Sequence, residues 1–501
     1  MTTKEIPLYI RASIITSCVA FLFGLDTGTI GPVTTMKSFT ETFGELSATI
    51  HGVVVSSILL PGALSALVAG ILADRHGRTK IISVGSCIYG IGAAIEAGAP
   101  LLGVFILGRL IKGLGEGLFL SAVFVQVSEI SPARIRGPMT SLPQFLIVLG
   151  LVAGYFICYG TARIQNSYHE STSLSWRLPL GLAAFLAFAF AATCSLVPPS
   201  PRWLLAKGRV EEARQIIAQL GLDEEEQQEM LAQSSSGLEQ IQHNDTTFLK
   251  SLYAMFGEFR EAFSAPFRSR TAFGCYIMGM QQFSGIDGVL YYAPILFQQA
   301  GLSGEQATFL ASGVSALVIL ATTIPATLFA DHWGRRTSSL LGGTLITFLM
   351  LLMGSLYAAG EVHADSGAGR WVVIVSIYLF AIVFNGTWAI GFRAFVVESM
   401  PRKTRSSASS LAQSANWIAN YIVALTTPVL ISRSTFGAYY FFAFCTLFTT
   451  IMIAIFMSET KGHSLEAIEQ RYLEDRAGRT SGRWTSAERG FRLTRLRVTQ
   501  G

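Results

Sequence analysis

The sequence predicts an all-α membrane protein with twelve transmembrane helices in two pseudo-symmetric six-helix bundles, joined by a cytoplasmic helical linker. Of the 501 residues, 51% are hydrophobic and 14% are charged, with a mean hydropathy of +0.47, whereas a soluble domain has roughly 25% charged residues. A spanning helix needs about 20 apolar residues. Stretches of that length without Asp, Glu, Lys or Arg occur at 178–197, 307–330, 337–360, 406–432 and 434–458. Polar motifs also recur in the two halves.

The first span begins after Lys4, Glu5 and Arg11. It has no small-residue cleavage site and it contains Asp26, so we expect a retained membrane helix rather than a cleaved signal peptide. The length of the uncharged runs and the positions of Gly and Pro place the spans at residues 10–30, 50–72, 79–97, 101–126, 139–160, 177–197, 270–298, 307–330, 338–359, 370–396, 408–432 and 434–457.

These spans divide the chain into four regions. We expect an N-terminal bundle at 1–197, a cytoplasmic linker at 198–268, a C-terminal bundle at 269–457 and a cytoplasmic tail at 458–501. Basic residues cluster in alternate loops, which by the positive-inside rule places both termini in the cytoplasm. The small net charge of +5 lies on those loops, a pattern that fits membrane topology and does not indicate nucleic-acid binding.

The linker and the tail are polar. Within the linker, "GRVEEARQIIAQLG" predicts a short amphipathic helix that ends at Gly221, and "DEEEQQEM" predicts an acidic, solvated continuation. The tail is rich in Arg and is interpreted as solvated and partly disordered, with weak contact to anionic lipid as the alternative.

Cysteine and histidine usage indicates neither an enzyme nor a metal site. The six cysteines lie singly in apolar segments and the seven histidines are scattered, so no metal cluster, nucleophile or phosphate loop is expected. The cysteines are interpreted as packing residues. His51 and His363 fall near predicted extracellular helix ends, where we expect solvated side chains.

Two acidic and basic motifs occur once in each half. The string "ADRHGRTK" after span two returns as "ADHWGRRT" after span eight, with Asp74 and Asp331 separated by 257 residues. Glu129 after span four returns as Glu398 after span ten, 269 residues later. A nearly constant offset predicts two equivalent bundles, and such repeats usually move about a site near the bilayer midplane.

From Phe23 to Gly462 the chain resembles the sugar porter branch of the major facilitator superfamily. The resemblance rests on "GLDTG", "DRHGR", "DHWGRR", "GRLIKG", "SEISPARIRG", "PPSPRWLL", "QQFSGID" with "YYAP", "SANWIANYIV" and "SETKG", which occur in order on the matching predicted helices. It implies the major facilitator fold, alternating access, a monomeric transporter without a cofactor, and a place in the plasma membrane.

The resemblance also implies a cytoplasmic gate. Charge-assisted pairs between helix ends can hold an inner gate closed and break when it opens; solvated loop charges of little individual importance are the alternative. The implied gate residues are Asp74, Arg78, Glu129, Arg136, Asp331, Arg335, Arg336, Glu398 and Arg405.

Asp26 lies inside an apolar span, where an unpaired carboxylate is costly. Arg109 in span four is the expected partner, because proton-coupled members of the family carry an acid and an arginine at these places. The hypothesis is that Asp26 binds the coupled proton; a permanent structural ion pair is the alternative. Lys112 and Glu116, on neighbouring faces of the same span, are interpreted as packing charges.

The resemblance implies a solute site of amides and aromatic side chains, which suit the hydroxyls and C–H faces of a sugar. Amides inside apolar helices can also join helices to one another, which is the alternative. The implied substrate-binding residues are Phe23, Gln144, Gln281, Gln282, Asp287, Tyr291, Asn385, Arg393, Asn416 and Trp417.

Two of these positions depart from the family pattern. Asp287 stands where most members have asparagine, and Arg393 stands where the site's tryptophan is usual, within "AIGFR" instead of a Gly-Pro-x-Pro-Trp string. The two charges can pair across the cavity. Because a guanidinium binds a carboxylate through two hydrogen bonds, a uronate such as galacturonate is slightly favoured as substrate, with a neutral hexose or pentose next.

Three further interpretations stay open at this point. A facilitative uniporter of a neutral sugar or polyol would use the same fold without proton coupling. A non-transporting sugar receptor is a second alternative, although this tail is shorter than those of known sensors. A membrane enzyme is the third, with no catalytic constellation to support it.

Overall fold

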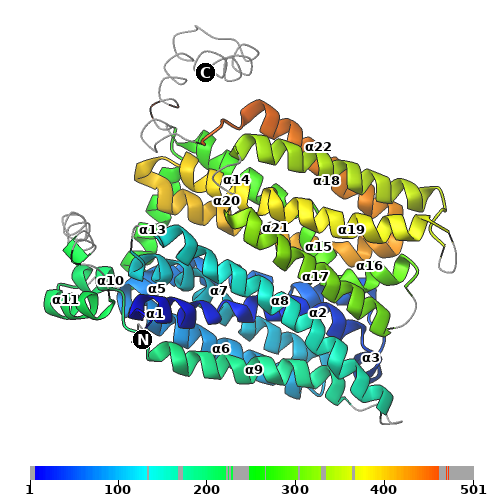
Figure 1. Cartoon of the computed structure of the whole chain (residues 1–501), viewed down its shortest axis with the longest axis horizontal. Coiled ribbons are helices and arrows are strands. Elements are labelled where there is room, and N and C mark those ends of the chain that lie inside the picture. Colours follow the sequence, from blue (N-terminus) through cyan, green and yellow to red (C-terminus); the bar gives the residue numbers. More distant parts are fainter. Residues whose placement is uncertain are drawn as a thin grey trace, which may run out of the picture. The chain divides into compact units, whose positions relative to one another are not determined.

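The computed structural model describes residues 6–132, 135–167, 173–221, 224, 227–228, 248–265, 267–302, 305–328, 334–363, 367–461, 470 and 472. Every regular element within these residues is a helix (Figure 1). The chain forms two compact units. Unit 1 comprises residues 1–254, 290–320 and 424–428, and unit 2 comprises 255–289, 321–423 and 429–501.

Unit 1 contains the first six predicted spans, the first two as pairs of shorter helices and the other four as single long helices. Its membrane helices are α1 (Leu8–Cys18) and α2 (Phe21–Thr35), α4 (Ala48–Ser56) and α5 (Leu59–His76), α6 (Arg78–Gly98), α7 (Leu102–Ile130), α8 (Arg136–Ser167) and α9 (Leu174–Ser195), with the short α3 (Lys37–Phe43) between the first pairs. Helix α6 packs on α7 and α9, α2 packs on α8, and α5 packs on α7.

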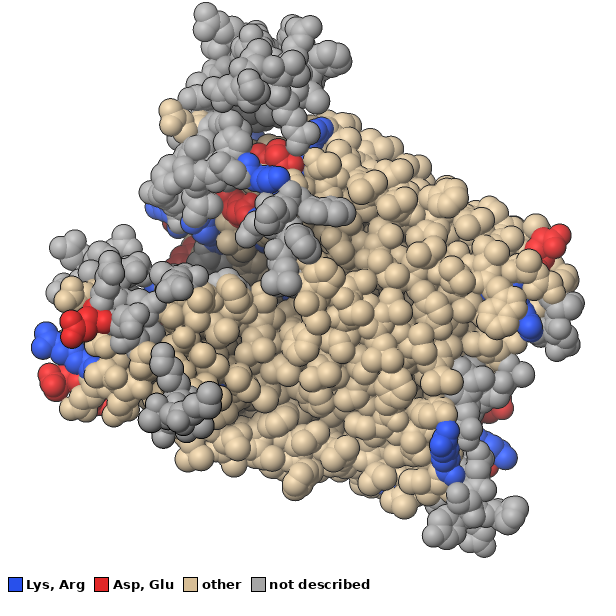
Figure 2. Space-filling model, viewed as in Figure 1, with Lys and Arg blue, Asp and Glu red and all other residues tan. Residues whose placement is uncertain are grey.

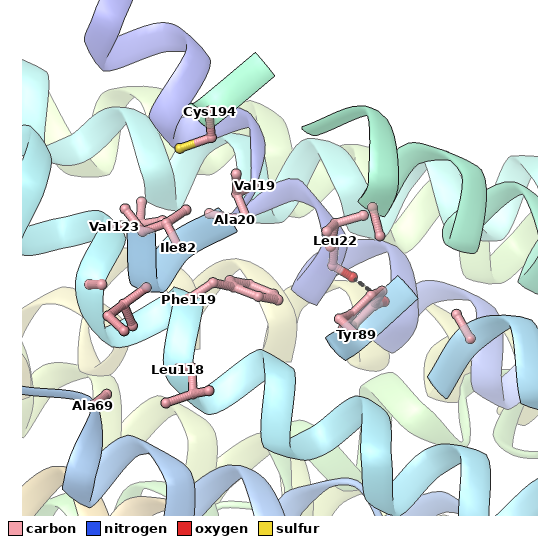
Figure 3. Packing of buried hydrophobic residues seen from close by; sticks show 14 of the residues in the cluster. Val19, Ala20, Leu22, Ala69, Ile82, Tyr89, Leu118, Phe119, Val123 and Cys194 are labelled. Carbon is pink, nitrogen blue, oxygen red and sulfur yellow. Dashed lines mark hydrogen bonds between the residues drawn. The ribbon is translucent and has the colours of Figure 1, made fainter. Parts of the chain in front are cut away.

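Small residues bring these helices together. A Cβ atom added at Gly92 of α6 would lie 2.4 Å from the backbone nitrogen of Lys112 on α7, so only glycine allows this approach. Apolar side chains from α2, α6, α7 and α9 form the surrounding core, with Leu22, Ile82, Phe119 and Cys194 among them (Figure 3). The Tyr89 hydroxyl inside this core donates to the Leu22 carbonyl at 2.9 Å.

Unit 2 repeats this packing with its own helices. They are α14 (Arg268–Gln282), α18 (Arg335–Ala358), α19 (Gly369–Gly386), α20 (Trp388–Ser399) and α22 (Thr435–Phe456), with most of α21 (Arg405–Arg433) and part of α17 (Glu305–Leu328). Helix α18 packs on α19, α20 and α22, as α6 packs on α7 and α9 in unit 1. The equal pattern inside each unit matches the repeat in the sequence.

The described residues contain 11 helical segments long and apolar enough to cross a membrane. The remaining predicted span, 270–298, is broken into α14, α15 (Ile286–Tyr291) and α16 (Ala293–Gln299). Gly285 at the first break has φ +88°, a left-handed conformation that interrupts a helix and favours glycine. With this broken span the structure has the twelve spans that the sequence predicts. Figure 2 shows charged side chains at the helix ends and uncharged helix sides on the face in view.

The linker helix is confirmed as α11 (Val210–Gln219), which buries Ala213 and Ile217 and is followed by Gly221 at φ +78°. Two other linker helices are α10 (Pro201–Ala206) and α13 (Phe248–Ala262). Most of the acidic continuation and nearly all of the tail lie outside the described residues.

Candidate functional site

Five ionisable side chains meet in the core of unit 1. They form what we call the charged cluster, which consists of Asp26 on α2, Glu96 on α6, and Arg109, Lys112 and Glu116 on α7. Asp26 is 4% exposed and Glu116 is 1% exposed, while the other three are 0% exposed. Burial this complete requires that the charges compensate one another, because an unpaired ion away from water is strongly unfavourable.

Both cations of the cluster contact Asp26. Arg109 Nη1 and Nη2 each lie 3.4 Å from one Asp26 carboxylate oxygen, and Lys112 Nζ lies 2.5 Å from Asp26 Oδ1. Arg109 is oriented by a second hydrogen bond of 2.9 Å to the Val55 carbonyl. The predicted pair of Asp26 and Arg109 is therefore present, within a larger network.

Lys112 is interpreted from the sequence as a packing charge near the bundle interior, and the structure places it there with two acidic partners. Its Nζ bridges Asp26 and Glu96, with 2.9 Å to Glu96 Oε2, and Arg109 Nη1 lies 4.0 Å from Glu96 Oε1. Sequence reasoning missed Glu96 altogether. Its signal was available, because Glu96 is an acid inside a predicted span, and such residues are functional candidates by default.

The expectation of a solvated His51 side chain is wrong. His51 is 9% exposed, its Nε2 lies 2.8 Å from Thr34 Oγ1, and its ring meets Tyr292 edge to face. Helix α4 begins at Ala48, so His51 lies in its first turn and packs into unit 1. His363, by contrast, is exposed as expected.

Three predicted sugar contacts form an amide network in unit 2. The Asn416 amide nitrogen on α21 donates to Gln281 Oε1 at 3.0 Å and to the Met278 carbonyl at 2.7 Å. Gln282 Nε2 donates to Asn416 Oδ1 at 3.1 Å, and Gln281 Nε2 donates to the Trp388 carbonyl at 2.8 Å. Trp417 follows on the same helix and is 7% exposed.

The two charged departures lie in unit 2 as well. Asp287 is half-buried at the start of α15 and accepts a hydrogen bond from Gln282, which connects it to the amide network. Arg393 on α20 is exposed and attracts Asp287 electrostatically. The ion pair between these two charges stays a prediction.

Asn385 makes a different set of contacts. Its Nδ2 donates to Thr323 Oγ1 at 2.9 Å and to Thr322 Oγ1 at 3.3 Å, so it joins α19 to α17. Thr322 also lines a cavity of about 230 Å³ in unit 2, together with Arg335, Ser338 and Thr387. These bonds fit the interhelical role that amides have in membrane helices, and a sugar contact by Asn385 stays a prediction.

The other three predicted contacts belong to unit 1. Phe23 on α2 and Gln144 on α8 are half-buried, and Tyr291 at the end of α15 is 3% exposed. Their assignment to the solute site stays a prediction.

The gate residues of unit 1 form ion pairs at one end of α6. Arg78 Nη2 lies 2.6 Å from Asp74 Oδ1, and Arg78 Nε lies 3.2 Å from Glu129 Oε2. Trp203 of α10 donates to the Asp74 carbonyl at 2.9 Å. The side chain of Arg136 lies outside the described part of the chain.

Unit 2 contains the matching pair of Arg335 and Glu398, at 3.0 Å. Sequence reasoning quoted "SETKG" and missed the role of Glu459 within it. This carboxylate accepts the backbone N–H groups of Arg335 at 2.7 Å and Arg336 at 3.2 Å, at the N-terminus of α18. Arg405 donates to the Met400 carbonyl at 3.4 Å. Asp331 lies outside the described residues.

Comparison with known proteins agrees with this arrangement. A family model described as "Sugar (and other) transporter" matches residues 12–472. The chain belongs to the sugar transporter family of the major facilitator superfamily. The resemblance inferred from the motifs is therefore confirmed.

Several relatives of this transporter match over most of its length. The glucose transporter GlcP of Staphylococcus epidermidis is 31% identical, over 92% of this chain and 96% of the relative. The low-affinity glucose transporter HXT1 of Saccharomyces cerevisiae is 30% identical, over 93% and 82%. The inward-open xylose transporter XylE from E. coli shares the fold with a TM-score of 0.75 at 24% identity, over 92% of this chain and 99% of that one.

Proposed function

We propose that this transporter couples the inward movement of a proton to uptake of a monosaccharide or a sugar acid. The observation that carries the proposal is Asp26, a carboxylate buried at 4% exposure with two cations in contact. XylE is titled a proton:xylose symporter, but its likeness at 24% identity concerns the fold. Proton coupling in this chain therefore rests on the charged cluster itself.

The geometry supplies a mechanism. Ionised Asp26 attracts Arg109 and Lys112 and so holds α2 to α7. A proton on Asp26 removes that attraction, and the two protonation states then favour different packings of these helices. A proton that binds one conformation better than the other shifts the equilibrium between them. The proton-dependent step of this mechanism therefore uses Asp26 and its two cations.

The amide network of unit 2 supports a polyhydroxylated solute. Gln281, Gln282 and Asn416 donate and accept in pairs, and a sugar hydroxyl can replace either partner because it also does both. The similar glucose transporters fit this class of solute. Arg393 adds a cation that can bind a carboxylate. We therefore propose a uronate such as galacturonate as a slightly favoured substrate, with a neutral hexose or pentose as the second candidate.

The coupling is tested in proteoliposomes with an imposed proton gradient. The wild-type protein is expected to accumulate labelled sugar, and an uncoupler should abolish accumulation. Asp26→Asn should lose accumulation and retain exchange of internal for external sugar, while Glu41→Gln, an exposed acid in unit 1, should behave as wild type. Accumulation by Asp26→Asn would contradict the proposal. If labelled sugar only equilibrated across the membrane, whatever the proton gradient, the protein would be a uniporter. Absence of any sugar flux would favour a receptor.

The substrate class is tested by competition. Free galacturonate, galactose and xylose are compared as inhibitors of labelled uptake by the wild-type protein, Arg393→Lys and Arg393→Ala. If a uronate is the substrate, Arg393→Ala should weaken galacturonate binding by about tenfold or more, as expected when a charge-assisted hydrogen bond is lost, with little change for galactose. If Arg393→Ala weakened the binding of all three compounds equally, or weakened none of them, the result would favour the neutral-sugar alternative.

We also propose that both termini lie in the cytoplasm and that the protein resides in the plasma membrane. The support is the clustering of basic residues in alternate loops. A cysteine placed at Gly360, in the loop after α18, should react with an impermeant maleimide in intact cells. A cysteine at exposed Lys207 should react only after permeabilisation.

A further inference from the structure

The charged cluster of unit 1 contains more acids than bases. Asp26, Glu96 and Glu116 carry three carboxyl groups, and Arg109 and Lys112 carry two cations. If all five were ionised, the buried core would hold a net charge of −1. A net charge in a water-free interior is strongly unfavourable, and a carboxyl group in such a place takes up a proton instead.

The hydrogen bonds show which carboxyl group is suited to this role. Lys112 Nζ is engaged by Asp26 Oδ1 at 2.5 Å and by Glu96 Oε2 at 2.9 Å. Both Arg109 amino groups face Asp26, at 3.4 Å. Glu116 is 1% exposed and makes no ion pair within 4.0 Å, and its Oε2 is buried without a hydrogen-bond partner in the described structure. The two cations therefore balance Asp26 and Glu96.

Among the described residues, the cations that act on Glu116 are Lys112 and Arg109. Lys112 and Arg109 precede it by one and two helical turns on α7, and Glu116 also interacts electrostatically with Glu96 and Tyr89 of α6 and with Asp26 of α2. His51 of α4 is engaged with Thr34. An ionised Glu116 would thus add a third negative charge beside two that are already paired.

We propose that Glu116 is a second proton-binding carboxyl group, which holds a resident proton and so keeps the charged cluster neutral. The resident proton leaves Asp26 and Glu96 as the ionised partners of the two cations. Asp26 then remains available for the proton that drives transport. The chemical part of this inference stands on charge balance and contacts, whereas its link to the transport cycle rests on the proposed function.

The test uses the purified full-length protein in lipid vesicles. Infrared spectroscopy at neutral pH records the C=O stretch of protonated carboxyl groups, which shifts in D₂O. The wild-type protein should show this band, Glu116→Gln should lose one component of it, and Glu41→Gln should keep the band whole, because Glu41 is exposed. Absence of the band from the wild type, or its full intensity in Glu116→Gln, would overturn the assignment.

A second variant tests charge balance without altering Glu116. Lys112→Met removes one cation, so a further carboxyl group must hold a proton and the band should gain a component. An unchanged band in a folded Lys112→Met protein would also overturn the proposal. Both infrared measurements are independent of transport, so they test the protonation of Glu116 even if the wild-type protein moves no sugar. Absence of transport would contradict the proposed function and leave this inference standing.

Transport supplies the functional comparison. Glutamine resembles a protonated glutamate, so Glu116→Gln should accumulate sugar to within about twofold of wild type, which corresponds to about 0.4 kcal/mol. Asp26→Asn should lose accumulation. Loss of accumulation in a folded Glu116→Gln protein that still exchanges sugar would show that Glu116 gives up its proton during the cycle, contrary to a resident proton.

Discussion

The charged cluster of unit 1 and the amide network of unit 2 place polar groups in apolar helices in two different ways. In unit 1 the groups are ionisable and at most 4% exposed, and the cations contact Asp26 and Glu96. In unit 2 the central groups are neutral amides that bond to one another, with half-buried Asp287 and exposed Arg393 nearby. The first arrangement is held by ion pairs, and the second has exchangeable hydrogen-bond partners.

This difference suits the two regions to two different ligands. A buried ion network responds to a ligand as small as a proton, because one proton changes its charge balance. An amide pair can exchange its hydrogen bonds for those of a hydroxyl without leaving any group unsatisfied. We therefore propose that Asp26 of the charged cluster binds the coupling ion and that the amide network binds the solute.

One member of the charged cluster has a polar counterpart at the equivalent position of unit 2. Glu116 and Asn385 are separated by 269 residues, the same offset as Glu129 and Glu398. Glu116 belongs to the charged cluster, whereas Asn385 bonds to two threonines of α17. The repeat thus conserves a polar position on equivalent helices, while the neighbouring side chains decide whether that position serves an ion network or an interhelical contact.

The largest expected effect comes from breaking the charged cluster. Glu96→Ala leaves Lys112 with Asp26 alone and should lower the free energy of unfolding by about 3–5 kcal/mol, since it removes one partner of a buried ion pair. Denaturant titration of the protein in lipid–detergent micelles measures the loss. Glu41→Ala, which removes an exposed acid whose carboxylate lies 3.8 Å from Lys37, should cost less than about 1 kcal/mol. Equal losses for both variants would contradict the ionic description of this core.

Much of this fold could be predicted from the sequence, because hydrophobic length and alternating loop charge are properties of local segments. The break of the seventh span was not predicted, since the polar string "QQFSGID" still reads as part of a long apolar run and only the left-handed Gly285 shows where the helix stops. The long spans agree with the structure because each of them is determined by its own residues.

The site was predicted less completely, and for a different reason. The pair of Asp26 and Arg109 came from the resemblance, whereas Glu96 joins it through the close approach of α6 and α7 at Gly92. A three-dimensional contact of this kind leaves no periodic signal in one chain. Glu459 was missed in the same way, because it contacts residues about 124 positions earlier in the sequence.

A smaller effect is expected from the amide network. Asn416→Ala removes hydrogen bonds with Gln281 and Gln282, and loss of such a partner costs about 1–3 kcal/mol. The dissociation constant for sugar should rise by about tenfold or more. The proton-dependent quenching of a fluorescent reporter placed near α7 should stay as in the wild-type protein. Isothermal titration with the preferred sugar measures the first quantity. Ser414→Ala, which alters a side chain bonded to its own helix, is the matched control, and an equal change in affinity would remove Asn416 from the solute site.

The smallest effect comes from the gate of unit 1, where Arg78 meets two acids of different exposure. The Asp74 side chain is 70% exposed and the Glu129 side chain is 13% exposed. Solvent screens the first pair, so Asp74→Asn should change the free energy of unfolding by less than about 0.5 kcal/mol, whereas Glu129→Gln should cost about 1–2 kcal/mol. Thermal unfolding of the two variants under the same conditions shows which of them loses more stability. A larger loss for Asp74→Asn would mean that Asp74 is sequestered from water in another conformation, and the gate would then depend on the acid that this structure leaves in solvent.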